Sequence, residues 1–484
     1  MAALAEAIGF FAPGTRILRL PAWDTLPYDR VSPNPEICAA RMNTLARLAD
    51  GPPPSGPAIV LTTVNASLQR LPPRSAVEGA LFRAEVGDGV DIEALIGFLV
   101  RNGYSRTGTV MEPGEFATRG GIVDIFAAGA DNPSRLDFFG DALETVRLFD
   151  PVSQLTIGEG RGIELVPVSE IQLTEDSIER FRAGYRELFG AVTGEDPLYA
   201  AISAKHRHAG MEHWLPLFHD GLETVFDYLG EGLITHDHLT IEARDDRLAQ
   251  IEDYYQARIA SQEAGYGQAP PYKPVPPAAL FLDAGEWDAA HGGRPGGVFS
   301  PFSQPADGET IDFGGRQGRN FAAERAQTEV NVFDALRGHV AGLRGAGRRV
   351  VIACFSRGSA DRLALLLADH QVEGVQPCEH WPAVIALPDG EAAMVVLGLE
   401  HGLETDDLAI IGEQDILGDR LVRRRRTRRA DQFLTETTQL SDGDLVVHVE
   451  HGIARYEGLV AIDVGGAPHD CLHLLYDGGD RLYL

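Results

Sequence analysis

Residues 134–139 have the chemistry of a protein-docking site. They read SRLDFF, and the alternation of a strand places Leu136 and Phe138 on one face and Arg135, Asp137 and Phe139 on the other. Arginine and aromatic side chains are the groups most often found as anchors at protein interfaces, so this pattern predicts a displayed binding face. From the pattern alone, a lone surface aromatic on an ordinary sheet is the simpler alternative.

Nucleotide hydrolysis is a second chemistry to consider, and the sequence argues against it. The phosphate-binding loop requires G-x-x-x-x-G-K-[S/T], because backbone amides surround the phosphates while the lysine neutralises the terminal ones. The only lysines are Lys205 and Lys273, and neither follows a glycine. The segment LAIIGEQDILGD does resemble a metal-holding strand that ends in acids, Glu413 and Asp415. Without the loop we interpret it as a strand followed by a solvated turn, and we expect no catalysis and no cofactor.

A histidine-rich segment is a further candidate metal site. An H-x-H step without a helix-spaced H-E-x-x-H or supporting cysteines is a weak signal for metal, so we expect a structural role and no metal. The residues concerned are His206, His208, Glu212, His213 and His219.

Composition limits the classes of protein that the chain can represent. The 484 residues carry a formal charge of −29, which repels phosphate backbones, so we expect no strong DNA binding by the chain itself. Four cysteines without a C-x-x-C pair argue against a disulfide framework and a zinc cluster. With no basic leader and no apolar run of roughly 20 residues, the expected location is cytoplasmic, without membrane contact. The run of arginines between Arg420 and Arg429 predicts a solvated linker, with contact to nucleic acid or an acidic protein surface as the alternative.

The first half of the chain reads as an α/β domain interrupted by a smaller module. Residues 59–64 (IVLTTV) predict a buried strand that feeds a helix. Near Leu81 the pattern changes to short strands and turns, which continue to about Pro167. After it, residues 224–229 and 233–241 read as strands that return to the first domain.

The second half predicts a small α/β unit followed by a meander of short strands. The Pro- and Gly-rich residues 292–315 are the best candidate linker. We then expect a helix at 329–343, strands at 349–354, 395–399 and 408–411, and a leucine-rich helix capped by Ser359. From residue 443 onward, glycine turns and alternating apolar residues predict a small β-barrel.

Two segments carry a resemblance to a known family. Residues 20–48 (LPAWDTLPYDRVSPNPEICAARMNTLARL) and 110–156 resemble the excinuclease-B-like front half of bacterial transcription-repair coupling factors. In that family the ATRG and RLDFF segments lie on the module that binds excinuclease A. The resemblance therefore implies contacts from Arg119, Arg135 and Phe139, with Phe138 adjacent and part of the core.

The last unit carries a second resemblance. Its motif HVEHGIARYEG is similar to the RNA-polymerase-interacting domain shared by coupling factors and CarD-type regulators. Matching by position implies that Ile462 and its neighbours Val460 and Asp463 contact the RNA polymerase β subunit. From the residues alone, Ile462 packed inside the barrel is an equal alternative.

Together these features predict an α/β multidomain chain. The expected domains are a split excinuclease-B-like α/β domain (1–79 and 168–310), an inserted α+β excinuclease-A-binding module (80–167), a small α/β domain ending in the Arg-rich linker (311–435) and a truncated small β-barrel (436–484).

The resemblance also implies what lies outside this sequence. Intact coupling factors continue into a DNA translocase motor, which supplies ATP and Mg²⁺ binding and DNA contact, so we interpret the chain as a fragment or a gene product cut short. We expect a two-ended adaptor for nucleotide excision repair that docks excinuclease A and RNA polymerase. The alternatives are an excinuclease-B-like damage-binding ATPase and a free-standing CarD-type regulator.

Overall fold

The computed structural model describes most of the chain. The described residues are 1–484 without 52–56, 79–80, 128, 193–195, 265–271, 303–304, 306–308, 328–329, 419–444, 449–451, 465–466, 477–479 and 484. They divide into two compact units, the first made of residues 1–18, 53–61 and 300–427, and the second of residues 19–52, 62–299 and 428–484.

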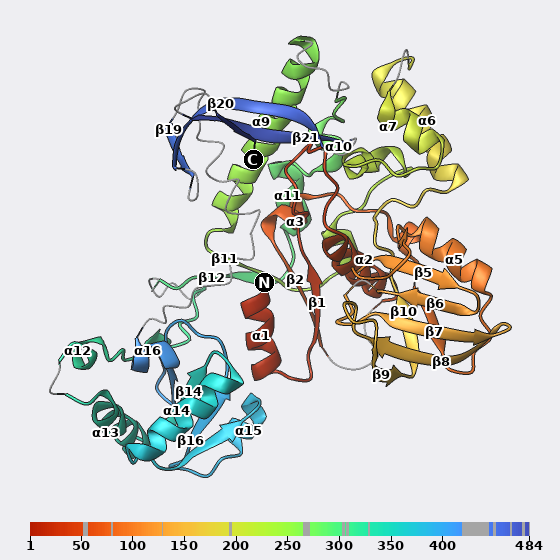
Figure 1. The fold of residues 1–484 in the computed structure, drawn as a ribbon. Helices are drawn as coiled ribbons and strands as arrows, with labels where there is room; N and C mark the ends of the chain where they lie inside the picture. Colours follow the sequence, from red (N-terminus) through yellow and green to blue (C-terminus); the bar gives the residue numbers. More distant parts are fainter. Residues whose placement is uncertain are drawn as a thin grey trace. The chain divides into compact units, whose positions relative to one another are not determined.

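The first unit is built on a six-stranded sheet in the order β13-β17-β18-β14-β16-β15 (Figure 1). Within it the strands β18, β14, β16 and β15 are parallel; helices connect β14 to β15 and β15 to β16, whereas β16 leads to β18 through β17. Its elements are α1 (Ala2–Phe11), β13 (Arg316–Gln317), α12 (Ala322–Arg325), α13 (Val332–Gly345), β14 (Arg349–Cys354), α14 (Arg357–Asp369), β15 (Val375–Cys378), α15 (Trp381–Ile385), β16 (Ala392–Val396), β17 (Leu403–Glu404), β18 (Leu408–Gly412) and α16 (Glu413–Leu417).

The N-terminal helix α1 belongs to the core of this first unit. Phe10 is buried in one cluster with Val351 of β14 and Val395 of β16. Two strands, β1 (Arg16–Leu20) and β2 (Ala58–Thr62), pair with each other. The predicted strand at 59–64 is confirmed over β2, which is followed by a helix, but only Leu61 of β2 is buried, so the expected buried strand is wrong because β2 lies in a two-stranded sheet.

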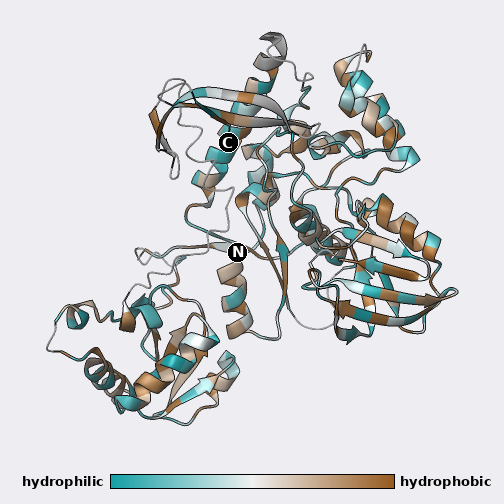
Figure 2. Cartoon of the chain, in the orientation of Figure 1, coloured by the Kyte–Doolittle hydropathy of each residue, from teal (hydrophilic) through white to brown (hydrophobic). Residues whose placement is uncertain are grey.

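The second unit begins with α2 (Pro35–Ala49), α3 (Val64–Leu68) and α4 (Arg74–Val77), and then enters a sheet-based module. Its strands β4 to β9 form a six-stranded sheet in chain order, and β3 pairs with β10. The elements are β3 (Phe82–Glu85), α5 (Ile92–Arg101), β4 (Ser105–Arg106), β5 (Glu115–Arg119), β6 (Ile122–Ile125), β7 (Ser134–Phe139), β8 (Ala142–Phe149), β9 (Thr156–Gly160) and β10 (Gly162–Leu165). Figure 2 shows apolar and polar segments alternating along these strands, as a sheet with one buried face requires.

The rest of the second unit is mainly helical. Its elements are α6 (Glu175–Phe189), α7 (Pro197–Ser203), η1 (Met211–Leu217), α8 (Val225–Leu229), β11 (Ile234–Asp237), α9 (Thr240–Ala264), α10 (Pro277–Leu280), α11 (Ala284–His291) and β12 (Gly296–Phe299). An aromatic-rich core that includes Tyr28, Phe181 and Trp214 joins these helices to the loop before α2.

The last residues form an antiparallel sheet in the order β19-β20-β21-β22. The strands are β19 (Leu445–His448), β20 (Gly452–Val464), β21 (Ala467–Tyr476) and β22 (Arg481–Tyr483). Buried Tyr456 and Leu474 lie in the small core of this sheet. The predicted meander of strands is confirmed, whereas closure into a barrel stays a prediction.

Two segments predicted as strands contain helices instead. Residues 224–229 form helix α8, because Thr224 and Asp227 make a capping box. Only residues 234–237 of the segment 233–241 are strand, and α9 begins at Thr240.

Two further predictions about local structure differ from the observed fold. The cap of α14 is Ser356 rather than Ser359, and the hydroxyl of Ser356 accepts the backbone N–H of Ser359. The predicted linker at 292–315 contains strand β12, which pairs in parallel with β11.

No helix in the described ranges is both long and apolar enough to cross a membrane.

Candidate protein-interaction sites

The six-stranded sheet of the second unit packs one face on the main core, and its opposite face carries charged side chains beside a second, smaller buried cluster that includes Ala117 and Phe149. On the buried face, a row of paired residues across β6, β7 and β8 consists of Val123, Leu136 and Val146, all in one core cluster. The next row along the strands lies on the opposite face and consists of Asp124, Arg135 and Arg147. We call this opposite face the polar face.

Arg135 lies on the polar face, but its guanidinium is already engaged. Its Nε and Nη2 donate to the two carboxylate oxygens of Asp124 at 2.7 and 2.9 Å, and its Cζ lies 4.6 Å from the ring centroid of Phe149. The hydrogen bond to Asp124 raises the pKa of Arg135. The side chain is 20% exposed, so one edge of it remains open to a partner.

Arg119 and Phe139 are more accessible. Arg119 is exposed, and its Nη2 donates to the carbonyl of Gly108 at 2.6 Å. Phe139 is 76% exposed and ends strand β7 at the turn into β8. Phe138 packs against the buried face, as the sequence predicted.

The structure places these predicted residues on strands β5 and β7, which are separated by β6. Arg119 is paired with Ile122, which is paired in turn with Asp137. Arg119 therefore lies two strands, or about 10 Å, from Asp137 on the same face. On β7, Arg135 lies two residues before Asp137 and Phe139 two residues after it. All three predicted contact residues therefore lie around Asp137.

Strand alternation predicted Asp137 on this face, but sequence reasoning missed Asp124, the partner of Arg135. Asp124 accepts both hydrogen bonds from Arg135, and Asp137 accepts from Arg147 at 3.0 Å and from Thr145 at 2.7 Å. A strand-pairing argument could have found Asp124, because the hairpin between β6 and β7 places it opposite Arg135.

The predicted polymerase contacts lie near the end of strand β20. Backbone pairing joins Ile462 to His469 and Asp463 to Pro468 of β21. Val460 is half-buried, and the side chains of Ile462 and Asp463 lie outside the described side chains. Their role stays a prediction.

The histidine-rich segment does not assemble a metal site among the described residues. Buried His213 lies within hydrogen-bonding distance of the carbonyl oxygens of Leu26, at 3.2 Å, and of Gly210, at 3.4 Å. Glu212 accepts from the hydroxyl of Ser32 at 2.7 Å. No group of three or more His, Cys, Asp or Glu side chains suited to a metal ion occurs in the described part of the chain.

The acidic segment after β18 differs from the predicted solvated turn. Glu413 and Asp415 are buried, and the segment forms helix α16. Asp415 accepts backbone N–H groups from Gly402 at 2.6 Å and Gly412 at 3.0 Å, which ties the loop between β16 and β17 to α16. The arginine run from Arg420 to Arg429 lies outside the described residues.

Two segments of the chain match models of known protein domains. Residues 82–171 match the family model of the UvrB interaction domain, which covers the sheet module from β3 to just after β10. Residues 440–484 match the CarD-like/TRCF RID domain.

Longer relatives carry the name of coupling factors. The chain is 30% identical to the transcription-repair-coupling factor of Escherichia coli K12 over 97% of its own length and 40% of that protein. It is 32% identical to the Myxococcus xanthus protein of the same name, over 100% of this chain and 41% of that protein. The corresponding values for the Mycobacterium bovis protein are 29%, 99% and 39%. The chain thus spans about two fifths of the length of these curated relatives. The chain is thus similar, over almost its whole length, to proteins named transcription-repair-coupling factor, and two of its segments match the UvrB interaction domain and the CarD-like/TRCF RID domain.

Proposed function

We propose that the chain is the adaptor region of a transcription-repair coupling factor, linking RNA polymerase to excinuclease A in nucleotide excision repair. One end of the adaptor is the polar face of the sheet module, with Arg119, Arg135 and Phe139 as contacts. The other end is the four-stranded sheet of residues 445–483, with Ile462, Val460 and Asp463 meeting the polymerase β subunit. Both ends dock partners and carry out no catalysis.

The exposure of Phe139 is the observation that carries the first half of the proposal. A phenylalanine that is 76% exposed leaves a large apolar surface in water. Burial of this surface against a partner would make a favourable hydrophobic contribution to the free energy of binding. Arginine and aromatic groups that share one face are enriched among the anchors of protein interfaces. The match of this module to the UvrB interaction domain supports a partner from the excinuclease system.

The three predicted contacts differ in how cleanly they can be tested. Phe139 and Arg119 are exposed, so replacing them leaves the core of the module intact. Replacing Arg135 instead removes the partner of Asp124, whose side chain is only 5% exposed. An uncompensated buried carboxylate destabilises a fold. Loss of binding in an Arg135 variant could therefore result from a damaged fold as well as from a lost contact.

The decisive experiment uses Phe139→Ala with Phe313→Ala as its matched control. Phe313 belongs to the first unit and is 77% exposed, so the two variants remove the same ring from equally accessible positions. We expect Phe139→Ala to weaken the affinity for purified excinuclease A by about tenfold or more, the size of a moderate hot spot, while Phe313→Ala leaves it unchanged. Calorimetry measures both variants. Unchanged affinity for Phe139→Ala would remove the excinuclease half of the proposal.

Reciprocal capture tests whether the two ends are separate. Ile462→Asp should abolish capture of RNA polymerase and leave capture of excinuclease A intact, whereas Phe139→Ala should weaken capture of excinuclease A and leave capture of RNA polymerase intact. Ile453→Asp is the control on the same strand, since Ile453 is 63% exposed and nine residues earlier. If both partners are lost together in either variant, the two-ended adaptor is wrong. Capture of polymerase alone by the unaltered chain would favour a CarD-type regulator.

A further inference from the structure

Three large apolar side chains are held in water around the turn between β8 and β9, at one edge of the six-stranded sheet (Figure 1). The exposed fractions are 81% for Val152, 68% for Leu155 and 56% for Ile157, which is the second residue of β9. We call these three residues the apolar rim. Single exposed apolar side chains are normal on a protein surface, whereas three that lie within six residues form a patch that a partner can cover.

Hydrogen bonds fix the shape of the turn that carries the rim. The backbone N–H of Asp150 donates to the carbonyl of Leu155 at 2.9 Å, and the carboxylate of Asp150 accepts the N–H of Ser153 at 2.7 Å. Gln154 has a φ of 60°, in the left-handed region that residues other than glycine rarely adopt. Its amide donates at 3.0 Å to the carbonyl of Val110, in the loop before β5. Because the turn is already ordered, little conformational entropy would be lost when a partner covers the rim.

The rim lies at one end of the polar face. Ile157 is two residues from Glu159, which is paired with Arg147 of the polar-face row, so strand alternation puts Ile157 on that face. The residue before Ile157 is paired with Phe149, whose ring lies under the guanidinium of the same face. Phe139 lies at the other end of the β7–β8 hairpin, roughly 20 Å away at about 3.4 Å per residue. The polar face therefore has exposed apolar side chains at both ends.

We propose that the apolar rim is a second anchor for excinuclease A, at the opposite end of the polar face from Phe139. This inference rests on the proposed function. A standard protein interface covers about 800 Å² on each partner and is therefore roughly 30 Å across, so one partner can reach both ends. Between the ends, Arg135 and Arg147 are paired with Asp124 and Asp137, so the centre of the face offers polar groups. The surface of excinuclease A that faces the rim is then apolar.

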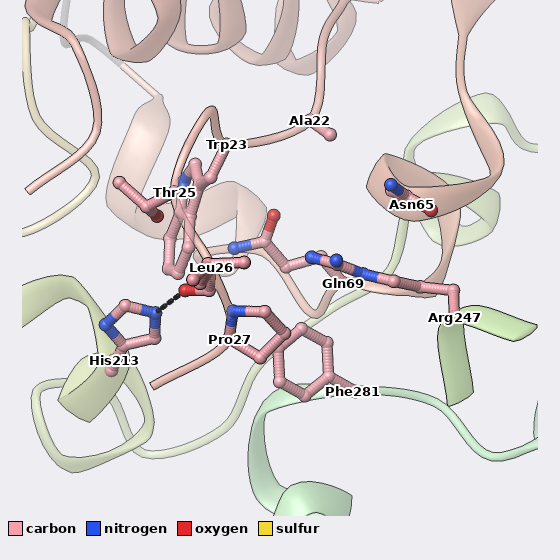
Figure 3. A pocket seen from close by; sticks show the side chains of 10 residues that line it. All are labelled: Ala22, Trp23, Thr25, Leu26, Pro27, Asn65, Gln69, His213, Arg247 and Phe281. Carbon is pink, nitrogen blue, oxygen red and sulfur yellow. Dashed lines mark hydrogen bonds between the residues drawn. The ribbon is translucent and has the colours of Figure 1, made fainter. Parts of the chain in front are cut away.

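Leu155→Asp tests the second anchor, because a carboxylate at this exposed position leaves the fold intact but opposes burial against an apolar surface. We expect calorimetry with purified excinuclease A to show an affinity about tenfold weaker or more. The matched control is Leu365→Asp on α14 of the first unit, where the leucine is 69% exposed, and it should leave the affinity unchanged. Buried Trp23, which lies beside Leu26 and Pro27 (Figure 3), should give unchanged fluorescence in each variant if the second unit is folded.

A double variant and hydrogen exchange separate this inference from the proposed function. Leu155 and Phe139 are far enough apart for their effects to add, so Leu155→Asp with Phe139→Ala should weaken binding by about a hundredfold. Backbone hydrogen exchange at residues 152–158 should slow in the complex, and unchanged exchange there would refute the second anchor. If Phe139→Ala weakens binding while Leu155→Asp does not, the second anchor is wrong and the proposed function stands. Unchanged affinity in Phe139→Ala would instead remove the proposed function, and this inference with it.

Discussion

Replacing Arg41 by methionine tests the buried ion pair that joins α2 to the end of the sheet module. Neither Arg41 nor Glu170 has any exposed side-chain surface. The Nε of Arg41 donates to the Oε1 of Glu170 at 2.5 Å, and its Nη1 donates to the carbonyl of Pro21 at 2.8 Å. Trp23 donates to the same carboxylate at 2.7 Å. Methionine is close to arginine in length but leaves Glu170 as a buried charge without this cation.

The expected loss of stability in Arg41→Met follows from this geometry. Opposite charges about 4 Å apart attract by about 4 kcal/mol at an effective dielectric constant of about 20. Breaking a buried pair by removing one partner typically costs about 3–5 kcal/mol, because the remaining charge stays desolvated. Trp23 still donates to Glu170 and offsets part of this loss. We therefore expect Arg41→Met to lower the free energy of unfolding of the second unit by about 3 kcal/mol.

Urea unfolding followed by tryptophan fluorescence measures the loss, because Trp23 contacts the pair directly. The matched control is Arg180→Met, which breaks an exposed pair with Asp220 at 2.7 Å. Arg180 is 41% and Asp220 84% exposed, so that pair should contribute less than about 1 kcal/mol. A loss below about 1 kcal/mol for Arg41→Met would refute the reasoning. Adding Glu170→Gln, which removes the orphaned charge, should recover part of the stability.

Two further predictions concern single sites. Burial lowers the pKa of His213 to about 4 from about 6.5 in the unfolded chain, so protons bind preferentially to the unfolded state between these values and stability falls as the pH falls. His213→Gln should therefore remove about 2 kcal/mol of the stability difference between pH 7 and pH 5, measured by urea unfolding, and a stability gap between the two proteins that does not change with pH would contradict this. In Gly162→Ala the new Cβ would lie 2.5 Å from the carbonyl oxygen of Ala84, so β3 and β10 must separate, at about 2 kcal/mol. Gly108→Ala, which meets open space, should change thermal stability little, and an equal loss in both would count against the steric cause.

Much of the element pattern could be predicted because hydrophobic periodicity is local. The strand at Arg349–Cys354 follows directly from its apolar run. The strand predicted at residues 224–229 is wrong. The β-branched and aromatic composition of this segment favours a strand, but the capping box between Thr224 and Asp227 starts a helix of five residues. The absence of a phosphate-binding loop led us to expect a solvated turn after β18, where the buried carboxylate of Asp415 instead accepts two backbone N–H groups.

The residues of the candidate docking site could be predicted from the sequence, but the ion pairs that they form could not. A period of two placed Arg135 and Phe139 on the displayed face, and the structure agrees. The strand that lies beside β7 decides whether Arg135 is free, and that depends on hairpin register rather than on the residue itself. The register brings Asp124 to Arg135, so a residue that looked like a free cation is held in a bidentate pair.

The pairing of Arg135 with Asp124 implies a different contribution to docking from each of the three predicted contact residues. Asp124 cancels the charge of Arg135, and Asp137 does the same for Arg147, so these arginines contribute little long-range attraction. Arg119 bonds to a neutral carbonyl and keeps its charge, in a chain whose formal charge is −29. If the polar face docks excinuclease A, Arg119 should supply the salt-sensitive attraction and Phe139 the buried apolar area. Arg135, fixed between Asp124 and Phe149, then offers a donor whose orientation is already set, so little side-chain entropy is lost when the partner binds.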